Sequence, residues 1–246
     1  IQNYDFAAVT EDGREFVKME GPFSTGLKNL GNTCYMNSIL QLFAMIPEFV
    51  QEILATPNEG ERWSDGHCQF YRLYKAMADG VPTVSPRLFR QVICEGHRDF
   101  MSHAQQDAAE FLLYFFNYVR VLNPNTCLTR AEFDSIDRMA CTSCLKYVDL
   151  PINEQRILLL EAPPHTQEEP LHISIEDLVR ISLLREQAER TCDFCQSKGS
   201  TASMLFKNFP DYLILVVVLN TVNEVGFAAK QNIDLHLDPN HLDLSG

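Results

Sequence analysis

Two pairs of cysteines with the spacing Cys-x-x-Cys could hold a metal ion. Cys141 and Cys144 form the first pair, and Cys192 and Cys195 form the second. Each pair has the spacing of a zinc knuckle, and two knuckles together complete a tetrahedral four-sulfur site. Because cysteine fills all four positions, no position is left for a catalytic water, so the pattern predicts structural zinc. The alternatives are four ordinary cysteines or a redox-active Cys-x-x-Cys, although a redox motif needs only one pair at a helix start.

Cys34 indicates a different chemistry, because it lies between a loop rich in Gly and Asn and an apolar helical pattern. A thiol in the first turn of a helix lies at the positive end of the helix dipole, which favours the thiolate form. Asn29 and Asn32, just before it, carry amide donors that could face a developing oxyanion. From these residues alone, a nucleophile and a buried structural cysteine are equally supported.

Helices are expected to position these residues in the first half of the chain. Apolar spacing predicts a helix over residues 35–46, and Ser85 is expected to cap another. The clearest helical pattern covers residues 102–119, where Ser102 and Gln105 match a capping box. The stretch carrying Cys34 therefore belongs to a mainly helical region.

Strands dominate the expectation for the second half. They are predicted over residues 145–150, 157–160 and 211–219, with one capped helix over 174–189 between them. Helices first and strands afterwards favour an α+β fold with a segregated antiparallel sheet over a doubly wound fold.

Composition and charge exclude several classes of function. The chain has 246 residues, 46% of them hydrophobic, and a formal net charge of −13, which disfavours direct binding to nucleic acid. No apolar run approaches the roughly 18 residues of a membrane span, so no membrane partner is expected. Eight cysteines in a chain of this size do not suggest a disulfide framework, and a cytoplasmic or nuclear location is expected.

Several of these motifs together resemble one protein family. The stretch "GLKNLGNTCYMNS" (26–38) closely resembles the cysteine box of the ubiquitin-specific proteases, and "QQDAAEFL" (105–112) is similar to their second hallmark. The paired Cys-x-x-Cys motifs resemble the zinc-bearing fingers of that family, and "FPDYLILVVV" (209–218) resembles the strand that follows them. Within the family, the uninterrupted box and the phrase "FPDYL" look most like the isopeptidase T group.

The resemblance implies a fold and a division of the chain. The fold would be the papain-like cysteine protease fold of the family, which is α+β. Residues 1–125 would form a mainly helical thumb that carries the cysteine box. Residues 126–205 would form the fingers with their four-cysteine zinc site, and residues 206–246 would begin an incomplete palm.

The resemblance also implies roles for particular residues. Cys34 would be the nucleophile, and the side-chain amide of Asn29, with the backbone N–H of Cys34, would stabilise the oxyanion. Asp107 matches an acidic position that contacts the backbone of the C-terminal tail of ubiquitin, although it could also compensate the dipole at a helix start. The implied activity is thiol-dependent hydrolysis of the isopeptide bond at the C-terminal glycine of ubiquitin. The expected partners are ubiquitin or polyubiquitin and ubiquitinated proteins.

The chain departs from the family pattern in one respect, because no C-terminal histidine box follows. None of its histidines has a suitable context as a base: His67, His97, His103, His165, His172, His236 and His241. Three explanations are open: a catalytic domain split by a large insertion with its histidine beyond Gly246, a chain that stops where order is lost, or a protein without catalysis. A split or truncated catalytic domain is favoured. The main rival is a catalytically inactive ubiquitin-binding scaffold in a larger complex. A zinc-stabilised interaction module unrelated to ubiquitin ranks last.

Overall fold

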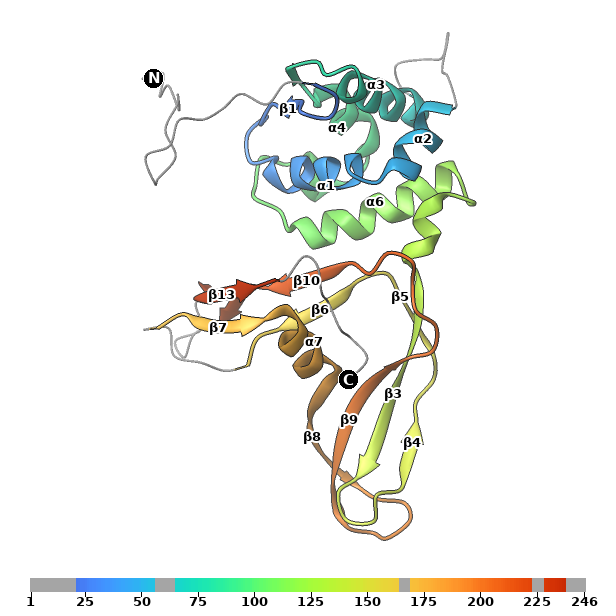
Figure 1. The fold of residues 1–246 in the computed structure, drawn as a ribbon, viewed down its shortest axis with the longest axis vertical. Coiled ribbons are helices and arrows are strands. Elements are labelled where there is room, and N and C mark those ends of the chain that lie inside the picture. The colour runs from blue at the N-terminus through green and yellow to red at the C-terminus, as the bar shows by residue number, and fades with distance from the viewer. Residues whose placement is uncertain (1–20, 56–64, 164–168, 223–227, 238–246) are drawn as a thin grey trace. The chain divides into compact units, whose positions relative to one another are not determined.

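A computed structural model describes residues 21–55, 65–163, 169–222 and 228–237 (Figure 1). The chain divides into two compact units, Ile1–Leu128 and Thr129–Gly246. Within the described residues, each unit buries a set of apolar side chains of its own.

The first unit is mainly helical, as its sequence pattern predicts. Its elements are β1 (Gly26–Leu27), α1 (Cys34–Ala44), α2 (Pro47–Ala55), α3 (Gly66–Ala78), β2 (Thr83–Val84), α4 (Arg87–Ile93), α5 (Arg98–Met101) and α6 (Ala108–Leu122). The two short strands β1 and β2 pair in parallel.

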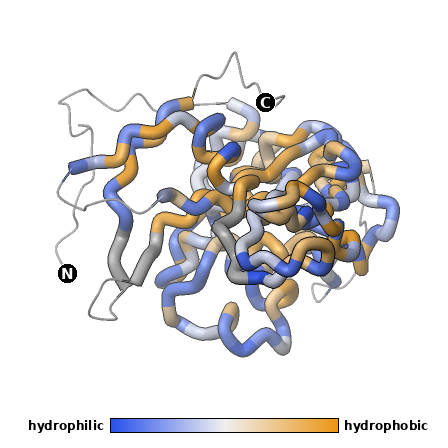
Figure 2. The backbone as a smooth tube through the Cα atoms, turned by 90° about the horizontal axis from the view of Figure 1, so that it is seen from below, coloured by the Kyte–Doolittle hydropathy of each residue, from blue (hydrophilic) through white to orange (hydrophobic). Residues whose placement is uncertain are grey.

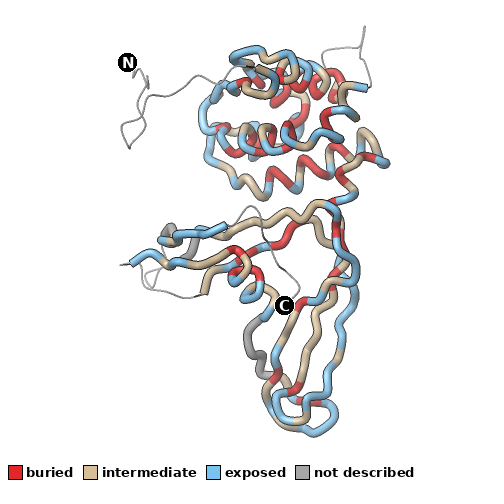
Figure 3. Tube along the Cα trace, viewed as in Figure 1, coloured by how far each residue is buried: buried red, intermediate tan, exposed pale blue. Residues whose placement is uncertain are grey.

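Aromatic rings from α1, α2, α3 and α6 form the centre of this unit. Phe43 stacks on Phe115 with ring centroids 4.6 Å apart, and Phe49 meets Tyr74 edge-on at 5.4 Å. All four side chains are completely buried, and buried residues recur along these helices (Figure 3). Each such burial stabilises the fold by about 1.5–3 kcal/mol, so the core can hold α1 firmly.

The helix α6 begins later than its sequence indicates. Its N-cap is Asp107, and Ser102 instead ends α5 in an extended conformation. The capping box predicted from Ser102 and Gln105 is therefore wrong. Ser85 also fails as a cap, because the N-cap of α4 is Pro86 and no side chain caps that helix.

A buried arginine accounts for the extended segment before α6. The Arg90 guanidinium donates to the carbonyl oxygen of Phe100 at 3.0 Å and to that of Ser102. These carbonyls are then engaged by a side chain instead of by helical N–H groups. The hydroxyl of Ser102 accepts from the N–H of Ala104 at 3.2 Å, which closes a local turn.

The second unit is mainly β-sheet. Its elements are η1 (Cys127–Ala131, a 3₁₀ helix that crosses the boundary), β3 (Phe133–Cys141), β4 (Tyr147–Asp149), β5 (Asn153–Gln155), β6 (Leu158–Glu161), β7 (Leu171–Ser174), α7 (Ile175–Leu183), β8 (Leu184–Thr191), β9 (Lys198–Phe206), β10 (Leu215–Val218), β11 (Asn220–Val222), β12 (Ala228–Lys230) and β13 (Ile233–His236). A five-stranded antiparallel sheet has the order β4-β3-β9-β8, with β5 also paired to β3. The apolar face of α7 packs into a cluster that includes residues of β3, β6 and β9. By contrast, buried residues are sparse along the β3–β9 ladder towards its tip (Figure 3).

Two features of this unit differ from the sequence-based expectation. The pairs β6–β10 and β7–β13 are parallel, whereas the sequence favours a segregated antiparallel sheet. The helix expected over residues 174–189 ends at Leu183, and the chain continues as β8, which pairs with β9. Ladder formation with β9 overrides the helical pattern of that sequence.

No single helix in the described ranges is long and apolar enough to cross a membrane. Among the described helices, α1 and α2 taken together reach that length and composition, and they are bent by 92° at their junction. Hydrophobic and hydrophilic stretches are interspersed along the trace (Figure 2).

Candidate active site and candidate metal centre

Cys34 is the first residue of α1, and its thiol is exposed and free. The helix begins here because Thr33 leaves helical geometry and buried Met36, Ile39 and Leu40 follow at helical spacing. The first N–H groups of a helix have no partner inside it, so the backbone N–H of Cys34 points out of α1 beside the thiol. An exposed thiol and a donor therefore coincide at the positive end of the helix dipole.

The loop before Cys34 closes on the side chain of Asn29. The Asn29 Oδ1 accepts from the N–H of Gly31 at 3.0 Å and from the N–H and hydroxyl of Thr33 at 3.1 and 3.2 Å. The Thr33 hydroxyl in turn accepts from the N–H of Leu30 at 2.9 Å. The oxygen of the Asn29 amide is thus held inside the loop, and the NH₂ group of this exposed residue bonds no other described residue.

Asn32 has a different role from Asn29, although both amides were candidates for the oxyanion. Its Nδ2 donates to the carbonyl oxygen of His103 at 2.9 Å. Its backbone has φ +52°, and Gly31 before it has φ +92°. The loop turns sharply through these two left-handed residues, a geometry that Gly and Asn tolerate better than other residues. The sequence indicated the amide of Asn32 but not this contact.

Two side chains of α1 hold the stretch before Cys34 against this helix. Asn37 donates to the carbonyls of Leu27 and Lys28, both at 3.3 Å, and Gln41 donates to that of Thr25 at 2.7 Å. The strand β1 is fixed on its other side by its pairing with β2. The loop before Cys34 is thus held between α1 and a short parallel ladder.

Asp107 is the N-cap of α6. Its Oδ1 accepts from the N–H of Ala109 at 2.6 Å and from that of Glu110 at 3.2 Å. The capping role expected as the alternative is present, and the second carboxylate oxygen bonds none of the described residues. Contact of Asp107 with ubiquitin stays a prediction.

In the described part of the first unit, none of the histidines (His67, His97 and His103) bonds to Cys34. His97 caps α5 and stacks on Phe100 with centroids 4.0 Å apart. His172 pairs through Nδ1 with Asp234 at 2.8 Å, on the adjacent strands β7 and β13. His165 and His241 lie outside the described residues.

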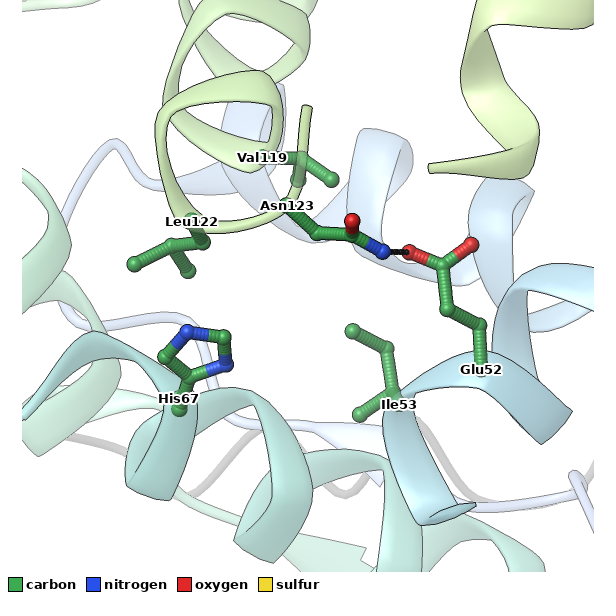
Figure 4. Close-up of a pocket in the computed structure, with 6 residues that line it drawn as sticks. All are labelled: Glu52, Ile53, His67, Val119, Leu122 and Asn123. Atoms are coloured by element: carbon green, nitrogen blue, oxygen red, sulfur yellow. Dashed lines mark hydrogen bonds between the residues drawn. The ribbon is translucent and has the colours of Figure 1, made fainter. Parts of the chain in front are cut away.

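A separate pocket of roughly 280 Å³ lies at the other end of α6 (Figure 4). It is lined by Glu52, Ile53, His67, Val119, Leu122 and Asn123. The Glu52 carboxylate there accepts from Asn123 at 2.7 Å, from Thr126 at 3.1 Å and from the N–H of Cys127 at 2.7 Å. Because both of its oxygens are engaged, Glu52 fastens α2 to the end of α6 and is not placed to act as a base.

The four cysteines of the Cys-x-x-Cys pairs converge in the second unit, as their spacing predicts. Their sulfurs all lie within 4.8 Å of one another, and the Cys141–Cys195 and Cys144–Cys192 sulfurs are each 3.7 Å apart. A tetrahedral site with metal–sulfur bonds of about 2.3 Å has sulfur–sulfur edges of about 3.8 Å. The cluster could therefore hold a metal ion.

The two halves of the cluster have the same backbone geometry. The N–H of Ser143 donates to the sulfur of Cys141, and that of Phe194 donates to the sulfur of Cys192, both at 3.4 Å. The residue after each pair is left-handed in both: Leu145 has φ +61° and Gln196 has φ +60°. Neither is glycine, so the strain was not visible in the sequence, and the repeated geometry marks two matching knuckles.

The electrostatics of the cluster are compatible with a bound cation. The pKa of Cys141 is lowered to about 6, because the backbone N–H groups of Cys144 and Ser143 donate to its sulfur. The pKa of Cys144 is raised to about 11, since burial and the three neighbouring sulfurs outweigh the lowering by the Lys146 N–H. Adjacent thiolates repel one another, and a bound divalent cation removes that repulsion and deprotonates all four.

Comparison with known proteins gives consistent matches across the chain. The sequence model described as ubiquitin carboxyl-terminal hydrolase matches residues 25–245. The chain is 30% identical over 256 residues to ubiquitin carboxyl-terminal hydrolase 14 of Schizosaccharomyces pombe, covering 87% of this chain and 32% of that protein. It is 26% identical over 298 residues to ubiquitin carboxyl-terminal hydrolase 5 of Mus musculus, covering 98% and 34%. The chain thus spans about a third of the length of these curated relatives.

A solved structure shares the fold. The SAGA Ubp8/Sgf11/Sus1/Sgf73 DUB module bound to ubiquitin aldehyde matches with a TM-score of 0.68 and 17% sequence identity, covering 87% of this chain and 51% of that chain. The α+β class expected from the order of elements is confirmed.

Proposed function

Since this chain belongs to the ubiquitin carboxyl-terminal hydrolase family, we propose that it carries the nucleophile of a thiol-dependent deubiquitinase. The reaction is hydrolysis of the isopeptide bond after the C-terminal glycine of ubiquitin. One observation carries the proposal. The loop closed by Asn29 presents an exposed thiol at the N-terminus of α1, with the Asn29 amide and the Cys34 N–H as candidate oxyanion donors.

Cys34 acts as the attacking group. Its thiolate forms a bond to the carbonyl carbon of the terminal glycine, and the carbonyl electrons move onto the oxygen. The Asn29 amide and the Cys34 N–H donate to that oxyanion. As it collapses, the C–N bond breaks and the lysine amine leaves with a proton. Water then hydrolyses the thioester, which releases the ubiquitin carboxylate and restores the thiol.

The reaction also needs an imidazole to accept and return the proton. Because no histidine in the described part of the first unit bonds to Cys34, we propose that this base is supplied from elsewhere in the protein. The same observation favours the second candidate function, a ubiquitin-binding scaffold without catalysis. The two differ in one respect: the enzyme forms a covalent intermediate through Cys34, whereas the scaffold binds ubiquitin whether or not that thiol is present.

Asp107 is proposed to contact the tail of ubiquitin. One carboxylate oxygen caps α6, and the other is free to accept from a backbone N–H of an extended peptide. Both roles are compatible, because each uses a different oxygen. Ubiquitin or polyubiquitin and ubiquitinated proteins are the proposed partners.

Zinc is the proposed occupant of the four-cysteine cluster. Cys141, Cys144, Cys192 and Cys195 would be its ligands, and four thiolates at tetrahedral distances suit Zn²⁺. With no position left for water, the ion would serve the fold and take no part in the reaction. Reduced thiols at this cluster and at Cys34 fit a cytoplasmic or nuclear location, which we propose for the protein.

The proposal is tested with ubiquitin that carries a thiol-reactive group at its C-terminus. The complete protein is incubated with this probe, and its intact mass is measured. We expect an adduct of one ubiquitin that Cys34→Ala abolishes and the control Cys127→Ala retains. Cleavage of a ubiquitin–lysine isopeptide, again lost in Cys34→Ala, establishes hydrolysis. Ubiquitin binding without adduct or cleavage would establish the scaffold instead.

A further inference from the structure

The loop of residues 29–34 carries Asn29 and Cys34, and the side chains of Asn29 and Thr33 form their hydrogen bonds inside it. The Thr33 and Cys34 carbonyls accept from the N–H of Asn37 and the hydroxyl of Ser38, which belong to the helix α1 that follows. Within the described part of the chain, Asn32 is the one residue of 29–34 whose side chain donates a hydrogen bond to a segment distant in sequence. It donates to the backbone carbonyl of His103 at 2.9 Å. We call this contact the Asn32–His103 latch.

The segment that receives the latch is itself rigidly held. The Arg90 guanidinium, only 9% exposed, bonds the carbonyls of Phe100 and Ser102. The Gln106 amide donates to the Ser102 hydroxyl at 3.1 Å and to the carbonyl of Asp99 at 3.0 Å. Residue 103 is therefore a fixed anchor, and four residues later the chain reaches Asp107 and α6.

We propose that Asn32 is a positioning residue that sets the direction of the Asn29 amide through this latch. The inference rests on the proposed function. The latch ties the loop with the oxyanion donors to the segment with Asp107, and so it aligns the two parts of the site that would grip the end of ubiquitin. Asn32 touches no reacting atom in this role.

The bonding pattern separates positioning from simple stability. Without the latch, the four internal bonds of the loop persist, and the aromatic core under α1 is unaffected. What is lost is the restraint on the orientation of the closed loop, whose central residues Gly31 and Asn32 are left-handed. A misplacement of an oxyanion donor by a fraction of an ångström weakens transition-state binding without preventing substrate binding.

The test uses Asn32→Gly, which keeps the left-handed backbone accessible and removes the latch. Asn32→Asp keeps the shape and removes the donor. Asn125→Gly is the matched control, because Asn125 is an exposed turn residue on the same unit whose side chain has no part in the site. Hydrolysis of a ubiquitin C-terminal amide by the complete protein gives kcat and KM. Alkylation of Cys34 by iodoacetamide, which forms no oxyanion, reports the thiolate itself and any effect of the added Asp charge.

We expect both Asn32 variants to lower kcat by about tenfold. KM should stay within about twofold of the wild-type value, and so should the alkylation rate once it is corrected for the added charge. Asn125→Gly should change none of these. Since the latch acts through Asn29, adding Asn32→Gly to Asn29→Ala should cost no more than a further twofold or so.

Other results would overturn the proposal. If kcat is unchanged in both variants, Asn32 is a structural residue only. The same follows if the reductions in kcat multiply in the double variant while its melting temperature falls. If the wild-type protein itself neither cleaves the amide nor couples to the ubiquitin probe, the proposed function fails and the positioning role fails with it. If the wild-type protein is active and the Asn32 variants are unaffected, the positioning role of Asn32 is refuted and the proposed function stands.

Discussion

At the scale of single residues, burial distinguishes the thiol of Cys34 from those of Cys94 and Cys127. Burial raises the pKa of Cys94 to about 12. Burial and the hydrogen bond to Glu52 raise that of Cys127 to about 12 as well. A raised pKa means that the thiol stays protonated at pH 8, with roughly a thousandfold less thiolate than an unperturbed cysteine. Cys34 is exposed and lies at a helix N-terminus.

We therefore predict selective alkylation at pH 8. Limited iodoacetamide treatment should label Cys34 first, as read by peptide mass spectrometry. We expect Cys94 and Cys127 to be alkylated at least 100-fold more slowly than Cys34. Denaturation in urea should make the three react at similar rates, which serves as the control. Equal labelling of Cys127 and Cys34 in the folded protein would contradict the burial and bonding assigned to Cys127.

The residue scale also marks a limit of what the sequence could predict. The Cys-x-x-Cys spacing was sufficient to foresee a four-cysteine cluster, because the chain geometry of a knuckle is local. From residue type and spacing alone, Asn29 and Asn32 could not be told apart, since both are amides near the same thiol, and it was the family resemblance that singled out Asn29. Their roles depend on the left-handed turn at Gly31 and on the distant His103 carbonyl, and neither is a local property.

At the scale of elements, Ser174 illustrates how one cap starts a helix. Its hydroxyl accepts from the N–H of Asp177 at 3.1 Å and donates to the Asp177 carboxylate at 2.7 Å. We predict that Ser174→Ala lowers the free energy of unfolding by about 1 kcal/mol, as measured by urea titration. Ser85→Ala is the matched control, because α4 has no side-chain cap, and it should stay within about 0.5 kcal/mol of wild type. Equal losses in both variants would argue against the cap.

Element boundaries show why sequence patterns were only partly sufficient. The spacing of apolar residues predicted α1 correctly, because these side chains are buried in the core of the first unit. The start of α6 and the end of α7 were predicted wrongly because a distant partner competes at each. Arg90 bonds the Phe100 and Ser102 carbonyls, so the segment before Asp107 is not helical. The end of the helix predicted after Ser174 instead pairs with β9 as the strand β8. The parallel pairing of β6 with β10 likewise joins strands far apart in sequence, and no local signal specifies its register.

At the scale of the whole molecule, the two units differ in what stabilises them. The helical unit has its own aromatic core. By contrast, the strands β3, β8 and β9 run to a tip where the four cysteines replace a hydrophobic core. A structural metal contributes its binding energy directly to folding, so the tip should depend on the ion, whereas the helical unit should not.

Metal removal should therefore unfold one region selectively. The zinc content is first measured on the purified protein, where we expect about one ion per chain, and none in Cys144→Ser. A strong chelator should then raise amide hydrogen exchange by at least tenfold across residues 133–149 and 184–206, while α1 and α6 keep their protection. Added Zn²⁺ should restore protection in wild type but not in Cys144→Ser. Uniform loss of protection in both units would mean that the units fold as one cooperative body. Unchanged exchange at the tip would mean that the β3–β9 ladder is stable without metal, and the cysteines would then need another explanation.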